Sequence, residues 1–150
     1  MPLTETIRSE MTAAMKAGDA PRRDALRLLV ASLHNARIAA GHDLDDDEAL
    51  RVLQREAKQR RDSIEEFRKG NRDDLVRIEE AELAVITSFL PAELSHEELG
   101  AIVRGVIDEA GATGPGDLGK VMGPLMERLA GRADGRRANA LVRELLSGTQ

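Results

Sequence analysis

The sequence predicts an all-α protein with an N-terminal four-helix bundle-like domain, residues 1–91, followed by a smaller three-helix domain, residues 92–150. Aromatic residues make up only 1% of the chain, so the core must be aliphatic. Strands favour β-branched and aromatic residues, whereas Ala, Leu, Glu, Arg and Met favour helices. No segment alternates apolar and polar residues with the period of two that is typical of a half-buried strand.

The first two helices are delimited by caps and glycines. The first is expected to run from a Thr4 cap to Gly18, and the second to open around Asp19 and Pro21 and end at Gly41, since proline is well tolerated in a first helical turn. Their apolar faces comprise Leu3, Ile7, Met11, Ala14 and Met15 in the first helix, and Leu26, Leu29, Leu33, Ala36 and Ala40 in the second.

The third helix is expected to begin after Asp45, which forms a capping-box pattern with Glu48, and to end at Gly70. The fourth is expected to start near Asn71 and to end before Pro91, because the residue before a proline disfavours the helical conformation. Their apolar faces comprise Leu50, Leu53, Ala57, Ile64 and Phe67, and then Leu75, Ile78, Leu83, Ile86 and Leu90.

Three shorter helices are expected in the C-terminal domain. Ser95 and Glu98 form a second capping box before a helix that ends at Gly111, and residues 111–117 form a loop rich in glycine. Asp117 is expected to cap the sixth helix and Asp134 the seventh. The apolar positions are Leu99, Ile102, Val103, Val106, Ile107 and Ala110 in the fifth helix, Val121, Met122, Leu125 and Leu129 in the sixth, and Leu141, Val142, Leu145 and Leu146 in the seventh.

Charge is distributed unevenly along the chain. The formal net charge is -5, which argues against a protein that is basic all over. Residues 93–116 contain one base and five acids, whereas residues 117–150 contain six bases and four acids. A polyanion contact is therefore expected in the last third of the chain.

The segment GRADGRR, residues 131–137, is expected to form the turn between the last two helices, with Gly131 ending the sixth. The arginines Arg132, Arg136 and Arg137 surround the start of the seventh helix, where free N–H groups favour anions. Asp134 competes for the same groups. Two interpretations remain equal: a phosphate-binding turn, and a capped turn with solvated arginines.

A second candidate contact surface lies on the third helix and comprises Arg55, Lys58, Arg60 and Arg61. Mixed charge is typical of a solvated helix face, with pairs such as Glu56–Arg60 contributing about 0.2–0.5 kcal/mol each. The alternative is a surface that contacts RNA or the C-terminal domain. Arg60 or Arg61 also replaces an apolar residue of the stripe, which predicts a polar contact with another element.

No catalytic residue, metal site or cofactor is expected. The segment GPGDLGKV, residues 114–121, has P-loop spacing, but Val121 replaces the hydroxyl residue that binds magnesium, and no strand precedes it. The acidic run at residues 43–48 lacks the turn glycine of a calcium loop. The chain contains no cysteine, no apolar run of membrane-spanning length and no secretory signal, so a cytoplasmic location is expected.

Four segments together resemble the YqeY family of bacterial proteins, which is related to the C-terminal tail of GatB, a subunit of glutamine-dependent aminoacyl-tRNA amidotransferase. They are MTAAMKAGDAPRRDALRLL, QRRDSIEEF, ELAVITSFLPAEL and GKVMGPLMERLAGRADGRRANALVRELL. The family's tail motif falls on Gly119, Lys120, Val121, Met122, Gly131, Ala133, Asp134 and Asn139. Pro124 departs from the family pattern, which leaves the length of the sixth helix open.

The resemblance implies an all-helical protein with a tail that contacts RNA. The expected function is a non-catalytic tRNA-associated module linked to glutamine-dependent amidation, with the phosphate contacts made by Lys120, Arg132, Arg136, Arg137 and Asn139. One alternative is a protein–protein adaptor for an amidotransferase or an aminoacyl-tRNA synthetase. A weaker alternative is a carbon–nitrogen ligase with glutamine as amide donor, an activity attached to the family by association only.

Overall fold

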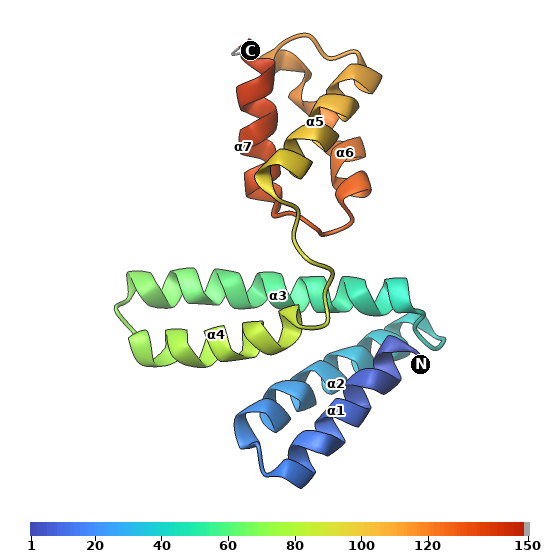
Figure 1. Ribbon diagram of the computed structural model, residues 1–150, viewed down its shortest axis with the longest axis vertical. Helices are drawn as coiled ribbons and strands as arrows, with labels where there is room; N and C mark the ends of the chain where they lie inside the picture. The colour runs from blue at the N-terminus through green and yellow to red at the C-terminus, as the bar shows by residue number, and fades with distance from the viewer. Residues whose placement is uncertain (149–150) are drawn as a thin grey trace. The chain divides into compact units, whose positions relative to one another are not determined.

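The protein is described by a computed structural model that covers residues 1–148 (Figure 1). Over these residues the chain forms seven α-helices and one short 3₁₀ turn, with no strand, which confirms the all-α prediction. The chain divides into two compact units, Met1–Leu90 and Pro91–Gln150. No helix within residues 1–148 is both long enough and apolar enough to cross a membrane.

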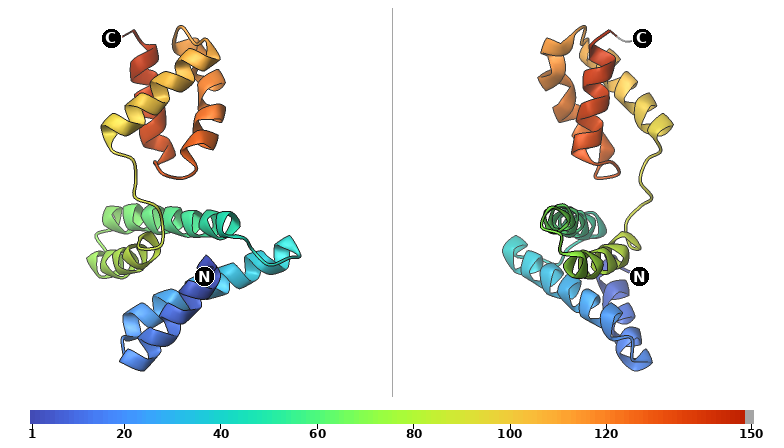
Figure 2. Two further views of the ribbon diagram at one scale, coloured as in Figure 1. Left: turned by 45° about the vertical axis from the view of Figure 1, so that its right-hand side comes forward. Right: turned by 90° about the vertical axis from the view of Figure 1, so that its left-hand side faces the viewer.

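The N-terminal unit contains two helical hairpins. The first pairs α1 (Leu3–Ala17) with α2 (Ala20–Ala40), and the second pairs α3 (Asp46–Lys69) with α4 (Asp73–Thr87), as every view shows (Figure 1, Figure 2). The buried cluster that joins them consists of Ile7, Ala14, Leu26, Leu29, Leu33, Ala49, Val52, Leu53, Ala57 and Ile86. This aliphatic core is the one that the composition requires.

Local capping signals predict several helix ends correctly. Asp19 accepts a hydrogen bond from the Arg22 amide, and Asp45 and Glu48 form the expected capping box. Gly18 and Gly41 end their helices with φ of 73° and 78°, a left-handed conformation that costs other residues more than glycine. The predicted Thr4 cap is wrong, because α1 already begins at Leu3, whose amide donates to Asp46.

The predicted limits of α4 are also too wide. Asn71 stands in the turn before the helix with φ of 56°, and α4 begins at Asp73 and ends at Thr87. Residues 88–90 form a turn, so α4 ends before the residue whose helical conformation Pro91 disfavours. Ile78, predicted to face the core, is exposed instead.

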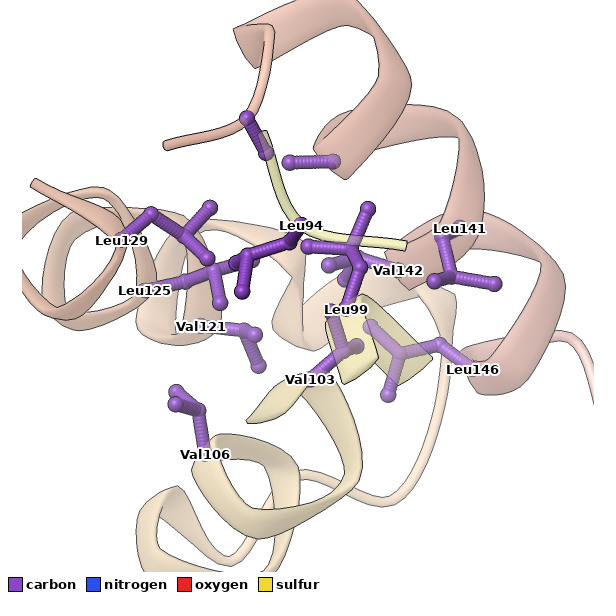
Figure 3. Packing of buried hydrophobic residues seen from close by; sticks show 12 residues of the cluster. Leu94, Leu99, Val103, Val106, Val121, Leu125, Leu129, Leu141, Val142 and Leu146 are labelled. Atoms are coloured by element: carbon purple, nitrogen blue, oxygen red, sulfur yellow. The ribbon is translucent and has the colours of Figure 1, made fainter. Parts of the chain in front are cut away.

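The C-terminal unit packs α5 (His96–Ala110), α6 (Leu118–Leu129) and α7 (Gly135–Leu146) around a second aliphatic core, with a 3₁₀ turn, η1 (Pro115–Asp117), before α6. Figure 3 shows side chains from all three helices meeting there. The cluster consists of Leu94, Leu99, Val103, Val106, Val121, Leu125, Leu129, Ala133, Ala138, Leu141, Val142 and Leu146. The Ser95–Glu98 capping box is confirmed.

The ends of α6 differ from prediction. Asp117 does not cap the helix through its side chain but accepts a hydrogen bond of 2.9 Å from the Thr113 amide, which closes the preceding loop. Ala130 ends α6 with φ of 48°, and Gly131, which was expected to take the left-handed conformation, follows it with φ of 80°. Pro124 lies inside α6 without ending it, which settles the question of its length.

Candidate nucleic-acid interface

The start of α7 is held by its own cap. Asp134 Oδ1 accepts a hydrogen bond of 3.2 Å from the Arg136 amide. The buried residues Ala133 and Ala138 on either side of this turn fix it to the core. The Asp134 carboxylate therefore takes up one of the free N–H groups at the start of α7, which is the capped turn that was one of the two interpretations of the sequence.

Arg137 is engaged within the unit. Its Nη1 donates a 2.9 Å hydrogen bond to the carbonyl oxygen of Leu94, while the Leu94 amide donates a 2.9 Å bond to the carbonyl of Arg132. The Leu94 side chain is itself in the core. These contacts attach the segment before α5 to the turn before α7, so Arg137 positions the fold and we leave it out of the interface.

Two arginines lie on the outward face of α7. Arg136 and Arg143 are both exposed, and their separation of seven residues places them on one side of the helix. Asn139 lies between them, and its Oδ1 accepts a 2.7 Å hydrogen bond from Arg143 Nε. We call Arg136, Asn139 and Arg143 the basic face of α7. Arg143 was not among the residues selected from the sequence, although its spacing from Arg136 was a usable signal.

The other two predicted contacts lie off this face. Lys120 is exposed in the first turn of α6, with Nζ 3.4 Å from Asp117 Oδ1. Arg132 is exposed in the turn after α6. The pKa of Glu98 is lowered mainly by hydrogen bonds with Ser95, and to a smaller extent by the charge of Arg132. Of the residues selected from the sequence, Arg136 and Asn139 therefore lie on the basic face, whereas Lys120 lies on α6 beside Asp117.

On α3, Arg60 forms a polar network with the neighbouring helices. Its Nε donates to Glu82 Oε2 of α4 at 2.8 Å, and its Nη1 donates to Glu56 Oε2 at 2.9 Å. Glu56 also accepts a 2.6 Å bond from Ser32 of α2. The Arg60 side chain is 14% exposed. The predicted polar contact with another element is confirmed, and the Arg60 guanidinium is engaged by these carboxylates with little of the side chain exposed.

This network contains three carboxylates around one guanidinium. Glu79 Oε2 lies 3.6 Å from Arg60 Nε and is buried without a hydrogen-bond partner among the described residues. Burial, and then the negative charge of Glu82, raise the pKa of Glu79, while Arg60 opposes the shift. The network therefore carries excess negative charge when all three carboxylates are ionised.

The remaining residues of the predicted α3 surface are ordinary helix-face residues. Arg55 is exposed, and Lys58 pairs with Asp62 one turn later at 3.2 Å. Arg61 is half-buried and engaged with neighbouring groups. Solvated positions of mixed charge describe this part of α3 better than a concentrated phosphate site. Among residues 1–148, no group of three His, Cys, Asp or Glu side chains is placed to hold a metal ion.

Comparison with known proteins gives a family model and a set of relatives. The model for Yqey-like proteins matches residues 4–146. The mitochondrial protein named Altered inheritance of mitochondria protein 41 is 35% identical in Lachancea thermotolerans, over 73% of this chain and 60% of the relative. The protein of the same name from Pyrenophora tritici-repentis is 29% identical, over 85% of this chain and 71% of the relative. The protein of that name from Eremothecium gossypii is 32% identical, over 71% of this chain and 60% of the relative.

These relatives correct two expectations. They are named as mitochondrial proteins and come from fungi, not from the bacteria that the resemblance implied, and they contradict the cytoplasmic location expected from the sequence. The chain spans about 60% of the length of two of them. The match of the family model over almost the whole chain shows that this protein belongs to the YqeY-like family.

Proposed function

We propose that the protein is a non-catalytic module that binds tRNA in glutamine-dependent aminoacyl-tRNA amidation, with the basic face of α7 as its contact surface. The observation that carries the proposal is the pair Arg136 and Arg143, exposed on one side of a helix whose other side builds the core. The tRNA and amidation parts of the proposal rest on the resemblance to the GatB tail.

The geometry of α7 suits phosphate binding. Guanidinium groups match phosphate oxygens with paired N–H donors. The helix that carries them is anchored by Ala138 and Val142, which are both fully buried, so the two arginines are presented on a rigid element. Arg132, in the turn before α7, is another exposed cation of the same unit.

The test is the binding of labelled tRNA to the whole chain over a salt series, followed by fluorescence anisotropy. The variant R136Q/R143Q removes both charges of the basic face. The control R104Q/R128Q removes two charges from α5 and α6 of the same unit, so the net charge is identical. Log affinity falls with log salt, and each lost phosphate contact should reduce the magnitude of that negative slope by about 0.7–0.9. We expect the magnitude to be smaller by about 1.4–1.8 for R136Q/R143Q and nearly unchanged for the control.

An equal effect of the two variants would mean that only the overall charge of the unit matters, and it would remove the basic face from the proposal. Absence of tRNA binding by the unmodified chain at low salt would refute the function itself. Neither variant removes a buried side chain, so both are expected to fold like the unmodified chain. Circular dichroism of both variants checks that their helix content is unchanged.

A second candidate function, a protein–protein adaptor, is favoured by the outer face of α2. Leu28 is 46% exposed and Ile38 is 65% exposed, with the exposed residues Ala31 and Asn35 between them on the same side of the helix. Purified amidotransferase or aminoacyl-tRNA synthetase should then bind the unmodified chain more tightly than L28S/I38S. In analytical ultracentrifugation, each candidate partner is mixed with the unmodified chain or with L28S/I38S. Separate sedimentation of the two proteins in every mixture would exclude these two partners.

A further inference from the structure

The aromatic residues of this chain bear on the kind of RNA that the α7 face can bind. The chain has no Trp or Tyr, and its two phenylalanines, Phe67 and Phe89, both belong to the N-terminal unit. Proteins that bind single-stranded RNA stack its bases on aromatic side chains, which contributes much of their affinity. The unit that carries the basic face has no Phe, Tyr or Trp, and its one histidine, His96, lies at the start of α5 and not on α7.

The basic face also offers little to the edge of a base. Asn139 Oδ1, which could accept from a base amino group, already accepts a 2.7 Å hydrogen bond from Arg143 Nε. Ala140, exposed between Arg136 and Arg143, has only a methyl group. The backbone positions of the two arginines are about 10.5 Å apart along the helix axis, because they are separated by seven residues with a rise of about 1.5 Å each.

We propose that this face binds the sugar–phosphate backbone of double-helical RNA, independently of base sequence, and this inference rests on the proposed function. A rigid helix that presents two guanidinium groups on one side suits phosphates whose spacing is fixed, as in a duplex. Double-stranded RNA is recognised mainly through its shape, phosphates and 2′-hydroxyl groups. Phosphate contacts fix the position of a protein on the nucleic acid and carry no sequence information.

The experiment compares four labelled RNAs at one low salt concentration. Two are 20-base-pair duplexes of unrelated sequence, the third is a 20-nucleotide strand designed not to fold, and the fourth is tRNA. We expect the two duplexes to bind with affinities within about twofold of each other and the single strand to bind at least about fivefold more weakly. R136Q/R143Q should weaken duplex binding, whereas R104Q/R128Q should leave it nearly unchanged.

The outcomes separate this inference from the function on which it rests. Equal or tighter binding of the single strand would overturn the duplex preference while leaving RNA binding in place. A large difference between the two duplexes would show sequence readout and would also overturn it. Binding of tRNA without binding of either duplex would point to a loop or a tertiary feature of tRNA. Failure to bind any of the four RNAs would refute the proposed function as well.

Discussion

Replacement of Arg60 by methionine tests whether this side chain is structural. Methionine keeps an unbranched apolar stem but removes the guanidinium from Glu56, Glu79 and Glu82. Breaking a buried ion pair costs about 3–5 kcal/mol because the partner charge is left uncompensated. The Arg60 side chain keeps 14% exposure, and burial raises the pKa of Glu79, so the cost should fall somewhat below this range. We expect R60M to lose about 2–3 kcal/mol of unfolding free energy at pH 7.

The assay is urea unfolding followed by circular dichroism, with K58M as the matched control on the same helix. Lys58 is 73% exposed and pairs only with Asp62 at 3.2 Å, so its replacement should cost less than about 0.5 kcal/mol. A loss by R60M no larger than that of K58M would refute the assignment. It would mean that the carboxylates relax into solvent, and Arg60 would again be available as a surface cation.

Three further substitutions test other parts of the structure. Burial and the charge of Glu82 raise the pKa of Glu79, so the wild-type protein loses stability as pH rises through that pKa. In urea unfolding, E79Q should be more stable than wild type by about 1 kcal/mol at pH 7, and this gain should fade below about pH 4.5. Equal stability of the two proteins at pH 7 would contradict this. R137M removes the hydrogen bond to the Leu94 carbonyl and should lower the melting temperature, at a cost of about 1.5–3 kcal/mol, without changing the salt slope of tRNA binding. G119A should stabilise α6 by about 0.5–1 kcal/mol in thermal unfolding, because no atom lies within 4 Å of the added methyl; destabilisation would reveal a neighbour that packs there.

Structure determined by near neighbours in sequence was predictable. The capping boxes that begin at Asp45 and Ser95 form as expected, because both partners lie within three residues of each other. Helix ends that depend on tertiary packing were not predictable. Asp117 binds the loop before it instead of capping α6.

The candidate site shows the same division. The interrupted apolar stripe predicted that Arg60 contacts another element, but its partner Glu82 lies 22 residues away and could not be identified from the sequence. Arg137 appeared to be one more phosphate ligand, because its acceptor is a backbone carbonyl 43 residues earlier, and a carbonyl has no sequence signature. The pairing of Arg136 with Arg143 was readable from helical spacing.

We propose that the basic face of α7 holds tRNA through its phosphates. The most direct measurement is the salt dependence of tRNA affinity for the whole chain, for R136Q/R143Q and for the charge-matched R104Q/R128Q. We expect the magnitude of the slope for R136Q/R143Q to be smaller than that for the unmodified chain by about 1.4–1.8, while the control keeps the wild-type slope. Identical slopes for all three proteins would contradict it.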